Sequence, residues 1–469
     1  MCALRSRELV AAASPTDRVR SGYRVVADTS VITSTAAPRR LLRILGLTFG
    51  VAVVVGGTVG IGILRAPGTV AGRLESPSLI YLVWLLGGGY ALIATNVYAE
   101  LASAIPRAGG PYLYVRRGLG EFAGFAAGWG DFAINTVAIA WTAVACSEFL
   151  VQLLPVLMGR EHLLAPALIV LLTAVNSLGV KTGSGLQQAL TLGKVLLLLG
   201  LVVAGFAYSG EAPEPMAGGR HLGLGASVVA VVVSVQFVLE TYAGYNNACY
   251  FGEELTDPGR NLPRSMFAGT LLVLVLYLLI NAALLHVLSP AQLATSTLPA
   301  ADALAKFYGP VARTAVTVVA AASALALLHG SVLLTPRILY GMSCDGLFRQ
   351  SGTYVTRTGV PLFALWVSAA VGLAFATLGS FEFLFAVTAV LTVLLDPLCA
   401  LALFVLRRRE PALARPYRSF GYPWLPGLVL ITGSSLFIAY FVANPRPSLI
   451  ACGLLAVALP LFSFVRRSR

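Results

Sequence analysis

The chain has 469 residues, of which 57% are apolar and 11% are charged, and its mean hydropathy is +0.83. A soluble chain of this length would carry about 25% charged residues. The composition therefore excludes a soluble globular enzyme, a disordered protein and a disulfide-stapled secreted domain. Uncharged apolar runs recur along nearly the whole chain, and one bilayer crossing needs about 20 residues. The sequence indicates an all-α polytopic membrane protein.

The amino-terminal segment, residues 1–40, is expected to be a disordered cytosolic tail. Eight arginines lie within the first 43 residues, and the apolar stretches between them are too short for the core of a signal peptide. We therefore do not interpret this segment as a cleaved leader.

Charged and turn-forming residues divide the remainder into twelve predicted transmembrane helices. Arg43 and Arg65 bound the first, and Ser289-Pro290 ends the helix of the long uncharged run that begins at Ser265. The predicted segments are 44–64, 76–99, 122–149, 163–180, 183–208, 226–251, 265–288, 312–338, 360–379, 382–405, 424–443 and 447–465.

The net charge of +13 is explained by topology rather than by nucleic-acid binding. With twelve spans both termini lie on one side, and 25 of the 33 basic residues then fall on that side. Seven fall on the opposite side, and Lys194 lies within a span. Because Lys and Arg in short loops mark the cytoplasmic side, we expect both termini in the cytoplasm and the chain in the cytoplasmic membrane.

The first and sixth spans are expected to be broken in mid-membrane. The first contains Gly56, Gly57, Gly60 and Gly62, and each glycine costs a helix about 1 kcal/mol relative to alanine. The sixth carries a polar run, Glu240–Asn247, inside an apolar stretch. Interrupted segments at matching positions of two halves are the best sequence indication of a transporter's binding site.

The sequence lacks the residue patterns typical of metal sites, intramembrane enzymes and channels. The six cysteines form no CxxC pair, so we expect no metal site, disulfide framework or cofactor. The four histidines lie far apart, which argues against an intramembrane enzyme. A channel would need a repeated pore motif or rings of charge, and neither is present.

Several motifs together resemble bacterial members of the amino acid–polyamine–organocation superfamily, particularly the L-type amino acid transporter branch. Besides the glycine-rich first span, they are Tyr98-Ala99-Glu100-Leu101, Pro106–Gly110, Leu171–Asn176, Glu253–Arg264, Arg407–Pro411 and Arg415-Pro416. The resemblance extends over residues 41–465. It implies a LeuT-type 5+5 inverted repeat at 41–405, with helices 11 and 12 and a short cytosolic carboxyl terminus at 406–469.

The resemblance also implies one amino acid site at the two helix breaks. The substrate carboxylate would bind backbone N–H groups of Ile61, Gly62 and Ile63, where the start of a half-helix is positive. Lys194 would replace a sodium ion. The residues whose carbonyls would accept the ammonium are Thr58, Glu240, Thr241 and Ala243. The side-chain pocket or gate would include Glu240, Tyr242, Tyr245 and Asn246.

Two departures from the family pattern limit this transfer of roles. Ile61 replaces a frequent serine, and Glu240 replaces a bulky aromatic gate. Glu240 could select a cationic side chain, carry a coupled proton or pair with a structural cation. Asp131 and Asp396, also within spans, are either functional or structural acids.

The sequence predicts a secondary active amino acid transporter, either an exchanger or a proton-coupled symporter. Its partners would be an amino acid, membrane lipid and protons, without nucleic acid. The alternatives are a polyamine, amine or cationic amino acid antiporter, and a transporter-derived nutrient sensor.

Overall fold

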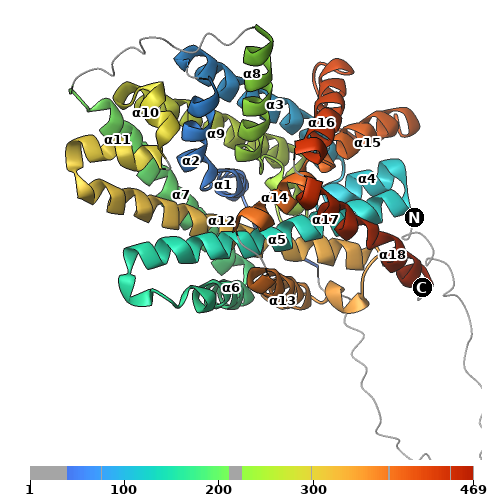
Figure 1. Cartoon of the computed structure of the whole chain (residues 1–469). Coiled ribbons are helices and arrows are strands. Elements are labelled where there is room, and N and C mark those ends of the chain that lie inside the picture. The colour runs from blue at the N-terminus through green and yellow to red at the C-terminus, as the bar shows by residue number, and fades with distance from the viewer. Residues whose placement is uncertain are drawn as a thin grey trace, which may run out of the picture. The chain divides into compact units, whose positions relative to one another are not determined.

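The computed structural model describes residues 40–74, 76–210, 224–296, 298–378, 381–443 and 445–467, which belong to one compact unit beginning at Pro38. The amino-terminal tail predicted for residues 1–40 lies outside these residues except for Arg40. The described part of the chain contains eighteen α-helices and three short 3₁₀ turns, and no β-strand (Figure 1).

The helices up to the middle of the chain are α1 (Leu47–Thr58), α2 (Gly62–Leu74), α3 (Pro77–Ala104), α4 (Pro111–Leu119), α5 (Glu121–Leu153), α6 (Glu161–Ser177), α7 (Val180–Phe206), α8 (Leu224–Thr241) and α9 (Pro258–Val287). Those that follow are α10 (Pro290–Thr295), α11 (Pro299–Tyr308), α12 (Pro310–Cys344), α13 (Leu362–Leu378), α14 (Phe381–Thr392), α15 (Leu395–Arg409), α16 (Trp424–Ala443), α17 (Pro445–Ala456) and α18 (Ala458–Arg467).

These helices confirm a polytopic membrane protein. Within the described residues, eight are long and apolar enough to cross a bilayer, or nine if the bent pair α1–α2 forms one span. Many large apolar side chains point outward, including Leu85, Val203 and Ile438, which are 52%, 67% and 64% exposed. Outward apolar side chains on this scale fit a lipid-facing surface rather than water.

All twelve predicted segments contain helix, but some boundaries differ. Arg65 does not end the first segment, because α2 continues through it to Leu74. The guanidinium Cζ of Arg65 lies 5.9 Å from the ring centre of Phe149, which gives the charge a partner inside the fold. The predicted end of the seventh segment is correct: α9 ends at Val287, and Ser289 caps α10.

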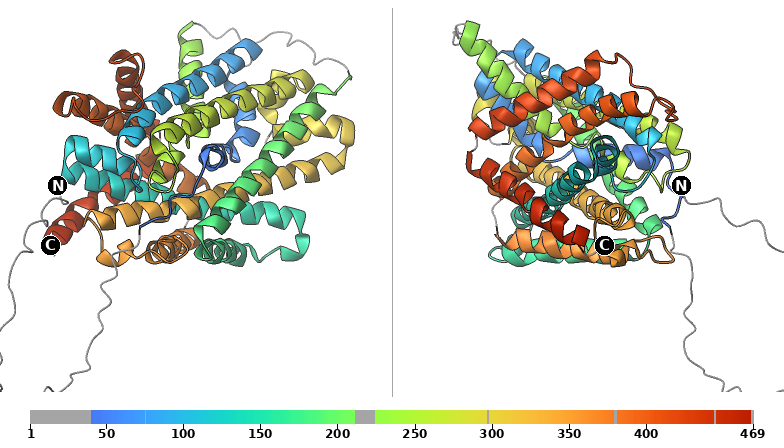
Figure 2. Two further views of the ribbon diagram at one scale, coloured as in Figure 1. Left: turned by 180° about the vertical axis from the view of Figure 1, so that it is seen from behind. Right: turned by 90° about the vertical axis from the view of Figure 1, so that its right-hand side faces the viewer.

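The helix α1 lies in the middle of the unit and packs against α7, α9 and α12 (Figures 1 and 2). The helices α6 and α13 lie side by side at its margin. In the most apolar stretch of α16, and likewise in that of α17–α18, only 17% of the residues are buried. In α12 the corresponding share is 78%. The carboxyl-terminal helices are therefore peripheral, and the broken first segment is central.

Candidate functional site

Both expected interruptions are present in the structure. The helix α1 ends at Thr58, and α2 begins at Gly62 with its axis bent by 45°. The helix α8 ends at Thr241, and turns and a 3₁₀ segment, Asn247–Tyr250, replace further α-helix up to Pro258. The second interruption is longer than the first, because no α-helix is present between Thr241 and Pro258.

The two interruptions touch at Gly244, whose φ is +122°. A Cβ placed there would lie 2.7 Å from Oγ1 of Thr58 and 2.9 Å from the carbonyl carbon of Gly57. Both values are too short for real contacts, and L-residues rarely adopt this φ. A glycine is therefore needed for the two backbones to approach this closely.

Side chains from neighbouring helices satisfy the carbonyls that the breaks leave without helical partners. Nζ of Lys194 on α7 donates to the carbonyls of Gly56 at 2.7 Å and Val59 at 2.5 Å. The hydroxyl of Tyr277 on α9 lies 3.1 Å from the carbonyl of Thr58 and 3.0 Å from that of Thr241. Because buried carbonyls need donors, these two side chains stabilise the interrupted backbone.

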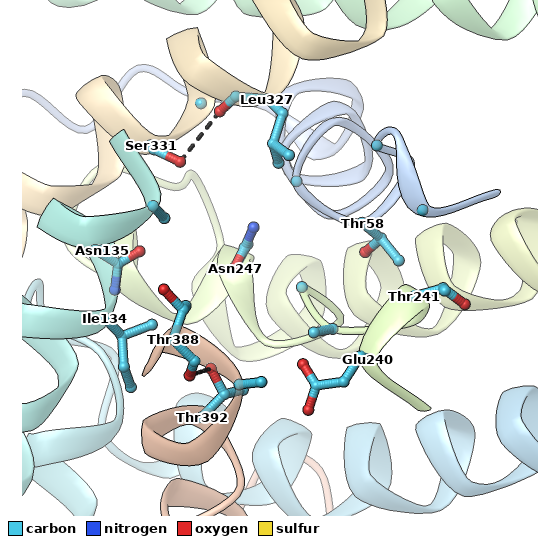
Figure 3. Close-up of a pocket in the computed structure, with 18 of the residues that line it drawn as sticks. Thr58, Ile134, Asn135, Glu240, Thr241, Asn247, Leu327, Ser331, Thr388 and Thr392 are labelled. Atoms are coloured by element: carbon cyan, nitrogen blue, oxygen red, sulfur yellow. Dashed lines mark hydrogen bonds between the residues drawn. The ribbon is translucent and has the colours of Figure 1, made fainter. Parts of the chain in front are cut away.

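A cavity of about 260 Å³ lies at the interruptions. The break between α1 and α2, the end of α8, and helices α5, α12 and α14 form its walls (Figure 3). Its polar side chains include Asn135, Asn247, Ser331, Thr388 and Thr392. The size and the mixed lining suit a small polar molecule.

The structure brings most of the predicted site residues to this cavity. The predicted residues that line it are Thr58, Ile61, Gly62, Glu240, Thr241, Ala243 and Asn246. Ile63 and Lys194 are fully buried outside the lining. Because the first amides of α2 have no partner within the helix, they are available to a ligand.

Tyr242 and Tyr245 lie outside this lining and face a neighbouring cavity of about 30 Å³. The hydroxyl of Tyr242 donates to the carbonyl of Trp84 at 3.2 Å. Asp396 also lines the smaller cavity, and its carboxylate accepts hydrogen bonds from Tyr245 at 2.5 Å and from Tyr90 and Tyr98 at 3.0 Å each. Glu240 lines both cavities.

The sequence prediction did not include Tyr277 or the hydroxyl and amide residues of α5, α12 and α14. One signal for Tyr277 was available, because it is a polar group inside the long uncharged run that begins at Ser265. Thr388 and Thr392 gave no such signal, since each hydroxyl can bond a carbonyl of its own helix.

A second group of contacts consists of ion pairs, and we call the region that contains them the ion-paired end. Its ion pairs are Glu100 with Arg407 and Arg415, Asp345 with Arg107 and Arg116, and Glu254 with Arg337. Two backbone bridges, Leu45 with Leu255 and Ala108 with Phe251, accompany them. The bridge between Leu45 and Leu255 joins the segment before α1 to the segment after the second interruption.

Comparison with known proteins places this arrangement in a family. The chain is 26% identical to the serine/threonine exchanger SteT of Bacillus subtilis, over 84% of this chain and 90% of the relative. It is 26% identical to the mouse b(0,+)-type amino acid transporter 1, over 90% and 87% of the two chains. The mouse Asc-type amino acid transporter 1 is 27% identical over 89% and 80%. The sequence model of the amino acid permease family matches residues 45–460, and the chain therefore belongs to that family.

Proposed function

We propose that this protein moves amino acids across the cytoplasmic membrane by alternating access. In this proposal twelve spans form a 5+5 inverted repeat at 41–405 and two peripheral helices at 406–469. The even number of predicted spans and the excess of basic residues on one predicted side support a cytoplasmic position for both termini. The exposed position of α16 to α18 supports their peripheral assignment.

The observation that carries the proposal is the meeting of two opposite helix ends at one cavity. The start of α2 offers N–H groups at Ile61, Gly62 and Ile63 and a partial positive charge, which suit a carboxylate. The end of α8 offers carbonyls and a partial negative charge, which suit an ammonium group. An amino acid zwitterion carries both groups two bonds apart, and both helix ends line the cavity.

The ammonium acceptors are the carbonyls of Thr58, Glu240, Thr241 and Ala243. The hydroxyl of Tyr277 lies within hydrogen-bond distance of those of Thr58 and Thr241, which share its single proton. A carbonyl oxygen has two lone pairs, so each can also accept from the substrate. We propose Tyr277 as the residue that orients these two carbonyls.

Lys194 acts in this proposal as a fixed cation behind the site. Its ammonium binds the carbonyl of Gly56, in the last turn of α1, and that of Val59, within the break, which is the role that a bound metal cation would fill. Glu240, on the wall shared with the smaller cavity, contributes to the side-chain pocket together with Asn246. Tyr242 and Tyr245 support this wall from the smaller cavity.

Exchange is the mode that we favour over proton symport, because SteT is an exchanger by name. The test is uptake of a labelled amino acid panel into liposomes that contain the purified protein. We expect uptake only when the vesicles are preloaded with amino acid. Uptake into empty vesicles that requires acid outside would establish proton symport instead.

A matched variant connects the uptake to the site. Gly62→Val places a branched side chain where a Cβ would already lie 3.2 Å from Cγ2 of Thr241, and it should abolish uptake. Gly193→Ala on α7, where a Cβ meets no other atom within 4 Å, should leave uptake unchanged. If folded wild-type protein takes up no amino acid under any condition, the proposed function is wrong.

A further inference from the structure

Asp131 on α5 is a carboxylate in the wall of the cavity of about 260 Å³ at the interruptions, and it is only 1% exposed. Its Oδ1 accepts hydrogen bonds from the hydroxyl of Tyr250 at 2.7 Å and from Nδ2 of Asn135 at 3.0 Å. Its Oδ2 is buried and has no hydrogen-bond partner among the described residues. Buried polar atoms are nearly always hydrogen-bonded, and an unpaired one is costly. This oxygen therefore has an unused acceptor position at a ligand cavity.

Asp131 lies in a different part of the cavity from the helix ends that suit the zwitterion. Asn135, its hydrogen-bond partner, lies across the cavity from Thr58 and Thr241 (Figure 3). An amino acid held at the helix ends would thus extend its side chain towards α5. Asp131, Asn135 and Tyr250 all line the cavity there.

The charged residues that line the cavity indicate which charge the side chain of the substrate carries. Its lining contains two carboxylates, Asp131 and Glu240, and one guanidinium, that of Arg65. A neutral zwitterion adds no net charge, whereas an amino acid with a second amine or a guanidinium adds one positive charge. A buried carboxylate is stabilised strongly by a cation that also donates hydrogen bonds.

We propose that Asp131 is a specificity-determining residue that binds the cationic end of the substrate side chain. The substrate class is then amino acids of the lysine, ornithine and arginine type. This inference rests on the proposed function, because the helix ends must hold the α-carboxylate and α-ammonium groups. The hydrogen bonds from Tyr250 and Asn135 fix one carboxylate oxygen and leave the other for the substrate.

The test compares Asp131→Asn with the wild type in proteoliposomes, using labelled lysine and labelled leucine. The substitution removes the charge but keeps the Oδ1 acceptor that Tyr250 and Asn135 use. We expect the wild type to take up lysine, and kcat/KM for lysine to fall by roughly 10- to 100-fold in the variant. Leucine uptake, where present, should change by less than about threefold.

Asp396→Asn is the matched control. The substituted residue is another buried carboxylate, which does not line the cavity of about 260 Å³ and whose two oxygens accept hydrogen bonds from tyrosines. It should change lysine and leucine uptake by the same factor. A thermal melt of each purified variant, followed by intrinsic fluorescence, checks that the protein is folded.

Three results would overturn the inference. Asp131→Asn could reduce lysine and leucine uptake equally, which would make Asp131 a structural residue. It could abolish acid-driven uptake of a neutral amino acid, which would make Asp131 a proton carrier. Wild-type protein that takes up only neutral amino acids would refute the inference and leave the proposed function standing, whereas no amino acid uptake at all would refute both.

Discussion

The carboxylates of the ion-paired end and those near the two cavities have different partners. At the ion-paired end Glu100, Glu254 and Asp345 each bind at least one arginine. Asp131 and Asp396, in the middle of the molecule, accept hydrogen bonds from tyrosine and asparagine, and no described lysine or arginine pairs with them.

This difference matches what each region has to do. A carboxylate with an arginine has its charge compensated within the chain, so it can hold segments together. Tyrosine hydroxyls occupy both oxygens of Asp396. Oδ2 of Asp131 has no partner among the described residues, so it remains available as an acceptor for a ligand. We therefore interpret the ion-paired end as a region that holds segments together and the middle as the place of binding.

The largest effect is expected from breaking the most buried pair at the ion-paired end. Glu254 and Arg337 are 0% and 4% exposed and form two hydrogen bonds of 2.8 and 2.9 Å. Arg337→Met would leave Glu254 as an unpaired buried charge, at a cost of about 3–5 kcal/mol. We expect a large fall in melting temperature, measured on the purified protein.

The double variant Glu254→Leu/Arg337→Met is the control for this prediction. It leaves no unpaired charge, so it should recover much of the lost stability. A double variant no more stable than Arg337→Met alone would show that shape, rather than charge, governs this contact.

Gly244→Ala tests the middle of the molecule, where the backbones of the two interruptions approach each other closely. The positive φ and the contact with Gly57 and Thr58 should cost about 2 kcal/mol or more and displace the interruptions. Amino acid uptake should be lost. Gly89→Ala on α3, where a Cβ meets no other atom within 4 Å, should keep wild-type uptake.

Tyr277→Phe should have a smaller effect because it removes one hydroxyl. The carbonyls of Thr58 and Thr241 would lose their common donor, at a cost of about 1–3 kcal/mol. We expect a rise in KM for amino acid uptake that exceeds the change in kcat. Unchanged kinetics would show that the hydroxyl does not orient these carbonyls.

The smallest effect is expected at the surface of the ion-paired end, where Arg117 binds Glu410 through bonds of 3.1 and 2.6 Å. Both side chains are more than a third exposed, so Arg117→Ala should cost only about 0.2–1 kcal/mol. The hydrogen bonds from Arg117 lower the pKa of Glu410. The stabilisation is therefore present above the ordinary glutamate pKa and is lost as pH falls through the lowered value.

Melting temperatures of Arg117→Ala and the wild type should accordingly converge on acidification. A difference that grows towards acid would contradict the assigned sign.

Residues 56–62 and 240–247 show how far local sequence could locate the site. Glycines clustered in one apolar run and polar groups in another predicted both interruptions. The low helix propensity of glycine and the cost of burying a polar group in a membrane are properties of the individual residues, so they can be judged from the sequence. The same reasoning misplaced the end of the first helix at Arg65. A charged side chain is costly inside a bilayer, which is why the sequence alone predicts the end of the span there. In the structure the ring of Phe149, from a distant segment, lies beside Arg65.

The sequence by itself determined the membrane class, the twelve apolar segments and the two irregular points, since composition and hydropathy are properties of short stretches. Only the tertiary structure decided that Lys194 and Tyr277 bind the carbonyls at those points, and that Asp131 shares a cavity with Glu240. Such contacts join residues far apart in the chain, and helix packing, which no local pattern encodes, brings them together.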